Sequence, residues 1–244
     1  MALADGSLEL FDDGLRSLRV ATREAIAVAR QATLLHRDIS PAYPTALVSG
    51  DDVVVLLHGL FATAGVLRPL REHVERTLGA HTASFTYPPG PGVEVLAARL
   101  ADLVAQLPDG VRIHLVGHSL GGVVVRWFVQ ELGGDPRVVQ TISMASPFAG
   151  TRHARLAPGG AGRDIASGSE VLERLGRSLA RASHLPHLSI VASDDALVTG
   201  SAALGAGDTL VVGECGHNGL LYHPEVLAEV VRRVRAVRDA VDRG

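Results

Sequence analysis

The sequence predicts an α/β fold in which a mostly parallel central sheet is covered by helices on both faces. Strand-like apolar runs alternate with helix-like segments from about residue 50 to the end of the chain, and such alternation is typical of parallel strands joined by crossover helices. The length of 244 residues suits one domain of this kind. A Gly-His-Ser-Leu-Gly pentapeptide at 117–121 stands between a strand-like and a helix-like run, which is the third observation that favours this class.

The elements of this domain follow one another regularly along the chain. Their predicted order is strand 53–57, helix 64–78, strand 82–87, helix 93–107, strand 111–116, helix 122–132, strand 138–144, strand 187–192, strand 209–212 and helix 224–241. Most of the strands are short runs rich in apolar residues, such as Val53-Val54-Val55-Leu56-Leu57. Glycine and proline mark the boundaries, as in the Pro-Pro-Gly-Pro-Gly run at 88–92 and the Gly-Gly pair at 133–134.

Residues 1–45 are predicted to form an N-terminal helical extension, and residues 46–244 the α/β domain. Residues 12–37 are interpreted as one helix because apolar side chains recur on one face, at Leu15, Leu18, Ala21, Ala25, Ala29 and Ala32. We expect this helix to dock on the domain. The alternative is a basic helix that lies on a membrane surface, where its mostly alanine stripe would give only weak contact.

Residues 150–186 interrupt the alternation of strands and helices. A helical turn at 152–156, a flexible glycine-rich stretch at 158–162 and a helix at 169–182 with Ser169 as N-cap are expected. We predict a small cap or lid over a site, with apolar side chains facing the pocket, including those of Leu172, Leu175 and Leu179. An ordinary crossover helix with a long loop is the alternative.

The pentapeptide at 117–121 fits the G-x-S-x-G pattern of a nucleophile elbow, where a sharp strand-to-helix turn lifts a serine hydroxyl out of the sheet. Glycine is expected on either side of Ser119 because a Cβ atom there would collide with the neighbouring strand or helix. The alternative is a Gly/Ser-rich turn between two core elements. A serine hydroxyl is a poor nucleophile at neutral pH and needs an adjacent base.

Candidates for an acid and a base follow Ser119 in the order typical of this elbow. Asp195 stands just after strand 187–192, and His217 lies in a glycine-rich loop after strand 209–212. His217 would accept the serine proton, and the carboxylate would orient the imidazole and stabilise its charged form. Asp194 is expected to face solvent or a helix N-terminus, and Asp208 or Glu214 remain alternative acids.

Two backbone N–H groups are predicted to form an oxyanion hole, that of Leu120 after the serine and that of Leu60 after strand 53–57. Three other histidines, His58, His114 and His118, are interpreted as hydrogen-bonding residues rather than bases. Cys215 is the only cysteine, so no intrachain disulfide can form. We expect it to be a small buried side chain.

Together, these motifs resemble the bacterial triacylglycerol lipase and esterase group of the α/β-hydrolase superfamily over about residues 50–240. The resemblance rests on the segments 58–60, 117–122, 145–151, 195–198 and 216–221. It implies the α/β-hydrolase fold and carboxylester hydrolysis without a cofactor. The acid motif of the group falls on Asp195, its histidine motif on His217 and its oxyanion loop on Leu60. Phe148 stands where the group usually carries histidine or asparagine.

Composition and motifs exclude several other function classes. A net charge of −3 does not suggest a nucleic-acid partner. Neither a nucleotide-binding glycine motif nor histidine spacing for a metal is present, so no cofactor or metal is expected. Apolar runs of about five residues are too short to span a membrane. The N-terminus lacks the features of a signal peptide, which favours a cytoplasmic protein unless a signal has been removed.

A serine carboxylesterase or lipase acting on a small-molecule or lipid ester is therefore the predicted function. An acyltransferase, or a thioesterase or amidase, would use the same triad. A non-catalytic binding protein on the same scaffold is the alternative from another class. Acyl chain length, head group and oligomeric state are not determined by these residues.

Overall fold

The computed structural model describes residues 5–198 and 202–241, with side chains for residues 14–198 and 202–240. Six strands in this part of the chain form one sheet in the order β2-β1-β3-β4-β5-β6. Their bounds are β1 Asp52–Leu57, β2 His81–Ser84, β3 Arg112–His118, β4 Val138–Met144, β5 His187–Ala192 and β6 Asp208–Val212. Every pair of neighbours in this sheet is parallel. The predicted fold class is therefore confirmed.

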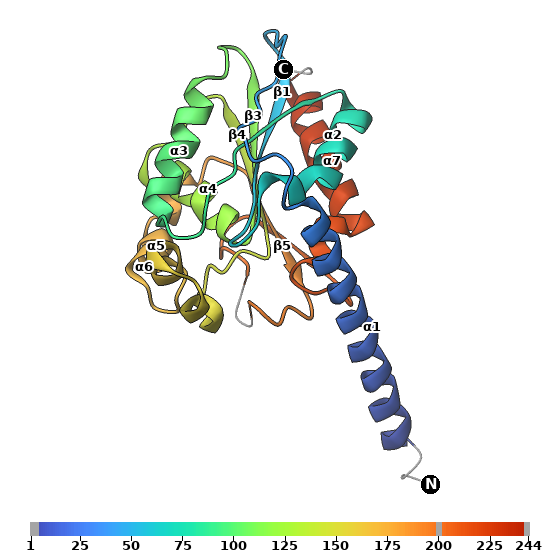
Figure 1. Ribbon diagram of the computed structural model, residues 1–244. Helices are drawn as coiled ribbons and strands as arrows, with labels where there is room; N and C mark the ends of the chain where they lie inside the picture. The colour runs from blue at the N-terminus through green and yellow to red at the C-terminus, as the bar shows by residue number, and fades with distance from the viewer. Residues whose placement is uncertain (1–4, 199–201, 242–244) are drawn as a thin grey trace.

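Helices cover both faces of the sheet (Figure 1). One face carries α2 (Arg68–Leu78), preceded by η1 (Ala64–Leu67), and α7 (Pro224–Val241), while the other carries α3 (Val93–Ala105) and α4 (Leu120–Glu131). Successive side chains of a strand point to opposite faces. Accordingly, Val53, Val55 and Leu57 pack in the core beneath α3 and α4, and Val54 and Leu56 in the core beneath α2.

The parallel topology brings the predicted site loops to one edge of the sheet. The carboxyl ends of parallel strands lie together, and the loops that follow them converge there. β1 leads into the loop that contains Leu60, β3 into Ser119, β5 into the segment with Asp195, and β6 into the loop with His217. These four segments are far apart in the sequence and meet only through the fold.

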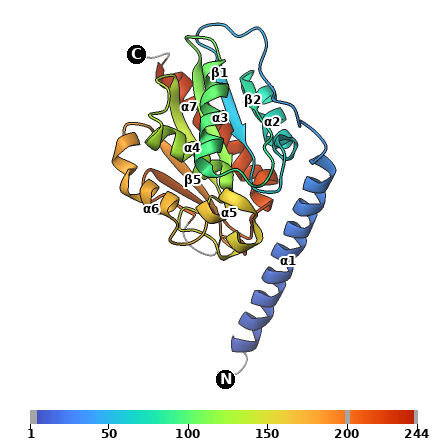
Figure 2. The ribbon, with the colours of Figure 1, turned by 60° about the vertical axis from the view of Figure 1, so that its left-hand side comes forward.

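The N-terminal helix α1 (Asp5–Leu34) extends well beyond the body of the molecule (Figures 1 and 2). It begins earlier and ends earlier than the predicted helix 12–37. Its C-terminal end abuts η1, since a Cβ atom at Gly65 would lie 2.3 Å from the carbonyl oxygen of Leu34. Among the described helices, none combines the length and apolar character needed to cross a membrane.

The face by which α1 docks is not the predicted one. All six residues of the alanine-rich stripe are exposed, and Leu18 is 64% exposed. From Gly14 onward, the positions of α1 that are buried or half-buried are Val20, Glu24, Ala27, Gln31 and Leu34, which recur at four- and three-residue spacing. The expected docking stripe was therefore wrong, because a different face of the helix is buried and it includes Glu24 and Gln31, whose side chains form hydrogen bonds with Asn218. The proposed boundary at 45/46 stays a prediction.

The segment 150–186 contains four short helices and lies at the carboxyl end of the sheet (Figure 2). It holds η2 (Arg152–Leu156), α5 (Gly159–Asp164), α6 (Glu170–Arg177) and η3 (Leu179–Ala182). Ser169 caps α6 as predicted, because its hydroxyl accepts a hydrogen bond from the Leu172 N–H. The stretch expected to be flexible forms α5, which is tied to the start of α3 by a 2.7 Å hydrogen bond from the Val93 N–H to Asp164.

Candidate active site

Ser119 occupies a sharp turn between β3 and α4, and its backbone is strained. Its φ of 53° and ψ of −121° lie in a region that costs a non-glycine residue about 1–3 kcal/mol. The turn is anchored by a 2.8 Å hydrogen bond from the Ser119 N–H to the Met144 carbonyl of β4. This conformation places a serine at the start of a helix, at the edge where the loops converge.

The glycines around Ser119 are sterically required. A Cβ atom at Gly117 would lie 2.3 Å from the carbonyl carbon of Gly121, inside the first turn of α4. A Cβ atom at Gly121 would lie 2.4 Å from the carbonyl oxygen of Leu57 at the end of β1. The predicted reason for glycine at these two positions is therefore confirmed, since backbone atoms cannot move aside cheaply.

Asp195 and His217 form a buried hydrogen-bonded pair. His217 Nδ1 donates to Asp195 Oδ2 at 2.8 Å, and the two side chains are only 6% and 3% exposed. The other carboxylate oxygen accepts the N–H groups of Leu197 and Val198, both at 2.8 Å. Burial raises the pKa of Asp195, but these hydrogen bonds outweigh it and hold the pKa below its ordinary value. The carboxylate is thus ionised at neutral pH and orients the imidazole.

The alternative carboxylates lie elsewhere. Asp194 forms an ion pair with Arg16 of α1 at 3.2 Å and is partly exposed, as expected for a residue whose side chain points away from the site. Asp208 pairs with Arg233, and Glu214 with two arginines of α1. Within the described chain, none of these three carboxylates forms a hydrogen bond or an ion pair with His217.

The loop after β1 lies directly against the serine. A Cβ atom at Gly59 would be 3.0 Å from the Cβ atom of Ser119. The N–H groups of Leu60 and Leu120 donate no hydrogen bond within the part of the chain that the structure describes. Two unengaged backbone donors thus flank the serine, one on the loop after β1 and one at the N-terminus of α4.

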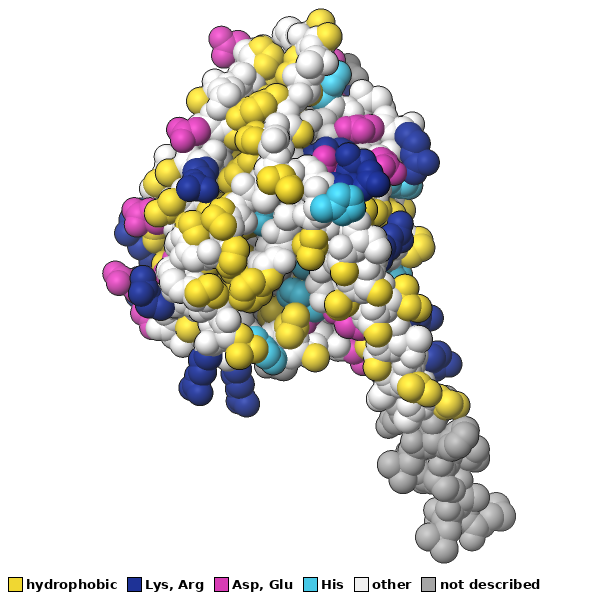
Figure 3. Space-filling view, in the orientation of Figure 1, with side chains coloured by type: hydrophobic (Ala, Val, Ile, Leu, Met, Phe, Trp, Pro, Cys, Tyr) yellow, Lys and Arg dark blue, Asp and Glu magenta, His cyan; other side chains and the backbone are white. Residues whose placement is uncertain are grey.

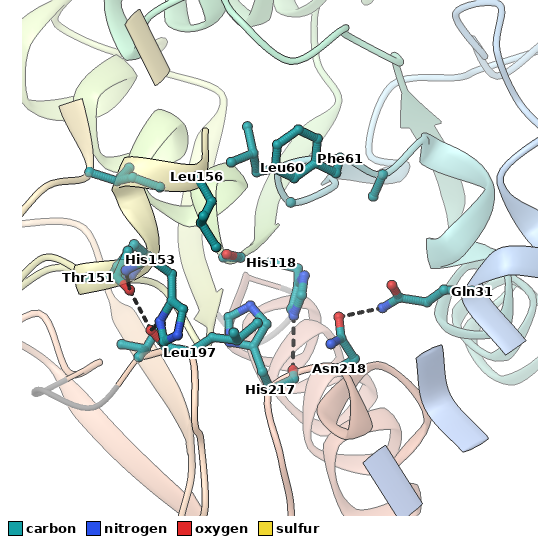
Figure 4. Close-up of a pocket in the computed structure, with 16 residues that line it drawn as sticks. Gln31, Leu60, Phe61, His118, Thr151, His153, Leu156, Leu197, His217 and Asn218 are labelled. Atoms are coloured by element: carbon teal, nitrogen blue, oxygen red, sulfur yellow. Dashed lines mark hydrogen bonds between the residues drawn. The ribbon is translucent and has the colours of Figure 1, made fainter. Parts of the chain in front are cut away.

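His118 supports the loop of His217 through a hydrogen bond. Its Nε2 donates to the His217 carbonyl oxygen at 3.1 Å, and the two rings lie 4.9 Å apart between centroids (Figure 4). Burial, together with the nearby His217, lowers the pKa of His118 to about 3. His118 is therefore neutral at physiological pH, consistent with its predicted hydrogen-bonding role.

The other two histidines also have structural partners. His58 stacks on Tyr87 with ring centroids 3.9 Å apart and accepts the Tyr87 N–H at 3.2 Å. Burial lowers its pKa to about 4. His114 is fully buried between Asp52 and Gln140, at 3.0 and 2.7 Å. The prediction that both are hydrogen-bonded in the interior is confirmed.

A pocket of about 210 Å³ opens at Ser119 and His217 (Figure 4). Its walls are mostly apolar, and its larger side chains are Leu60, Phe61, Leu156, Ile165, Leu197 and Val198. In the space-filling view, hydrophobic side chains gather beside a hollow in which histidine side chains are visible (Figure 3). Phe61 and Leu156, at 56% and 75% exposure, carry this apolar character out to the surface.

The insertion contributes to the pocket with different residues from those expected. Leu172 and Leu175 of α6 are buried in the core beneath α3 and α4, and neither these nor Leu179 lines the pocket. The expectation that these leucines face it is wrong, because α6 turns its apolar face to α4. The lining residues of this segment are Thr151, His153, Leu156 and Ile165.

Three polar lining residues were missed by the sequence reasoning. The Thr151 hydroxyl and His153 Nδ1 both donate to the Leu197 carbonyl and steady the segment after Asp195. Gln31 of α1 donates to the side chain of Asn218 at 2.8 Å. Thr151 ends the segment 145–151, which the resemblance to lipases and esterases includes. Gln31 lies in α1, far from the other site residues in the sequence, and no local motif marks it. No cluster of three metal-binding side chains occurs among the described residues.

Solved structures of a lipase and an esterase share this architecture. The mature lipase BlEst2 from Bacillus licheniformis matches with a TM-score of 0.63 and 14% identity, over 80% of this chain and 96% of the lipase. An esterase from Pyrobaculum calidifontis matches with a TM-score of 0.53 and 16% identity, over 94% and 93% of the two chains. The present chain spans 38% of the length of phospholipase PlaB from Legionella pneumophila, with a TM-score of 0.48 and 18% identity over 59% of this chain. The first two likenesses establish the α/β-hydrolase fold.

Residues 48–183, more than half of the chain, match the family described as "Putative serine esterase (DUF676)". Ser119, Leu60 and Leu120 lie inside the matched region, whereas Asp195 and His217 lie beyond it. No curated protein matches the sequence. The resemblance to serine lipases and esterases is confirmed at the level of family and fold, and the chain belongs to this serine esterase family.

Proposed function

We propose that the protein hydrolyses carboxylic esters through an acyl-enzyme formed on Ser119. The observation that carries this proposal is the 2.8 Å bond between His217 Nδ1 and Asp195, together with the pocket that His217 and Ser119 both line. A carboxylate bonded to Nδ1 leaves Nε2 as the free basic nitrogen of the imidazole. The strained turn at Ser119 further supports a functional serine, since strain of this kind is retained at reactive sites.

The reaction proceeds in two halves. His217 Nε2 takes the Ser119 proton as Oγ attacks the ester carbonyl, and the carbonyl oxygen gains the negative charge of the tetrahedral intermediate. The N–H groups of Leu60 and Leu120 stabilise that oxygen, each contributing on the order of 3 kcal/mol. His217 then gives its proton to the leaving alcohol, and a water molecule releases the carboxylic acid from Ser119 by the same steps in reverse order.

The substrate class follows from the pocket walls. Apolar side chains from the loop after β1, the insertion and the segment after Asp195 favour an acyl group of low polarity. Carboxylesters, including lipid esters, are the best match. Transfer of the acyl group to an alcohol, or attack on a thioester or amide, would use the same residues and differ in the acceptor or leaving group.

A chain-length series of p-nitrophenyl esters tests this function. Wild-type protein should hydrolyse them, and Ser119→Ala should lose several orders of magnitude in kcat. Ser183→Ala is the matched control, because Ser183 is an exposed serine away from the pocket. Retained hydrolysis in Ser119→Ala would contradict the proposal, as would a wild-type protein inactive on every ester. Addition of glycerol distinguishes hydrolysis from acyl transfer through the products.

A further inference from the structure

The docking face of α1 binds the loop that carries His217. Glu24 Oε1 accepts the backbone N–H and the side-chain Nδ2 of Asn218 at 2.8 and 2.7 Å. Glu24 Oε2 accepts the Gly219 N–H at 3.0 Å. Two helical turns later, Gln31 donates to the Asn218 Oδ1 atom (Figure 4). Helix α1 thus holds the two residues that immediately follow His217.

The residue before His217 is also adapted to Glu24. A Cβ atom at Gly216 would lie 2.5 Å from Glu24 Oε2, and the other closest atoms belong to the same side chain. The carboxylate therefore touches the loop on both sides of His217. Among the described residues, no cation forms an ion pair with Glu24, and its hydrogen bonds all go to Asn218 and Gly219.

His217 is consequently held by three independent contacts. Asp195 orients its ring through Nδ1, His118 donates to its carbonyl oxygen, and Glu24 fixes the following backbone. Hydrogen bonds between a carboxylate and backbone N–H groups are charge-assisted and stronger than neutral ones. Glu24 does not line the pocket around Ser119, so it has no direct route to the substrate.

We propose that Glu24 is a positioning residue, which holds the loop 216–219 so that the imidazole of His217 faces Ser119. This inference rests on the proposed role of His217 as the base. Helix α1 lies outside the family-matched region 48–183, yet on this account it is part of the catalytic apparatus. Loss of the Glu24 contact should misplace the base by a fraction of an ångström, which lowers kcat rather than substrate affinity.

Two substitutions test the contact in different ways. Glu24→Gln replaces one acceptor oxygen by an N–H donor that must face a backbone N–H. Gly216→Ala displaces the carboxylate by volume and leaves its charge intact. Arg19→Gln is the matched control, because Arg19 lies on the same helix and loses only an exposed 3.4 Å pair with Glu214.

Steady-state kinetics on a soluble ester should show a split between kcat and KM. We expect each of the first two variants to lower kcat about tenfold with KM within about twofold, and Arg19→Gln to remain near wild type. The double variant should be no slower than the worse single variant, since both remove one interaction. Alkylation of Cys215, which is buried near α1, should stay slow in all variants and show that the helix remains docked.

Wild-type kcat in Glu24→Gln would overturn the inference. Rapid Cys215 alkylation that accompanies the loss of kcat would also overturn it, since the helix would then act only by keeping the fold together. The wild-type and Ser119→Ala proteins in the same assay distinguish this failure from that of the proposed function. If hydrolysis still depends on Ser119 but is unaffected in the Glu24 and Gly216 variants, the proposed function stands and only the inference about Glu24 fails.

Discussion

Replacing Asp195 by asparagine should disable the site and leave the fold intact. One oxygen of Asp195 accepts His217 Nδ1, and the other accepts two backbone N–H groups. An asparagine that keeps its oxygen on the backbone N–H groups must turn its NH₂ group toward Nδ1. Nδ1 would then have to act as an acceptor, so the proton would move to Nε2 and the base would be lost.

The expected loss in kcat is on the order of 10⁴, or roughly 5 kcal/mol of transition-state stabilisation. Asp194→Asn is the matched comparison, because it alters a neighbouring carboxylate that pairs with Arg16 at 29% exposure. Exposed pairs contribute about 0–1 kcal/mol, so kcat should fall less than about tenfold. Both variants should be assayed on one ester, with thermal unfolding as the check on folding. A larger loss at position 194, or small losses at both, would refute the reasoning.

Three further outcomes are expected. His217→Ala should lower kcat/KM by several orders of magnitude, and His118→Ala by less; the reverse ranking would reassign the base. Burial lowers the pKa values of His58, His118 and His187 to about 4, 3 and 3, so these residues are neutral in the folded protein at pH 5. In the unfolded chain they take up a proton below about pH 6.5, which favours unfolding. Each histidine should therefore lower the free energy of unfolding by about 2 kcal/mol at pH 5. Urea unfolding should therefore show stability lost as pH falls from 7 to 5, and equal stability at both would contradict it. Burial raises the pKa of Cys215 to about 12, so native alkylation at pH 8 should be far slower than in urea; equal rates would refute this.

The sheet and the serine elbow could be predicted because their signals are local. Strands β4 and β5 and helix α7 have the bounds expected from their apolar runs. The glycines at 117 and 121 are required by backbone contacts within the elbow and with the neighbouring strand. The segment with Asp195 follows its strand directly, and the parallel topology brings that segment to the edge where His217 stands.

The contribution of α1 to the site could not be predicted from helical periodicity. Its alanine-rich stripe resembled a docking face, but the residues that contact the body include Glu24 and Gln31, whose partners lie about 190 residues away in the sequence. The leucines of α6 were misassigned for a related reason. Their spacing shows that one face is buried, but it does not show whether α4 or the pocket covers that face.

Active-site labelling tests the central claim most directly. A fluorophosphonate should react once per chain, and trypsin should release the adduct on the peptide 113–126, in which Ser119 is the only serine. His217→Ala should slow the labelling, because the serine then lacks its base. One adduct on this peptide, absent from Ser119→Ala, is the predicted result. An adduct on another peptide, or no reaction in a protein that hydrolyses esters, would contradict the assignment of Ser119 as the nucleophile.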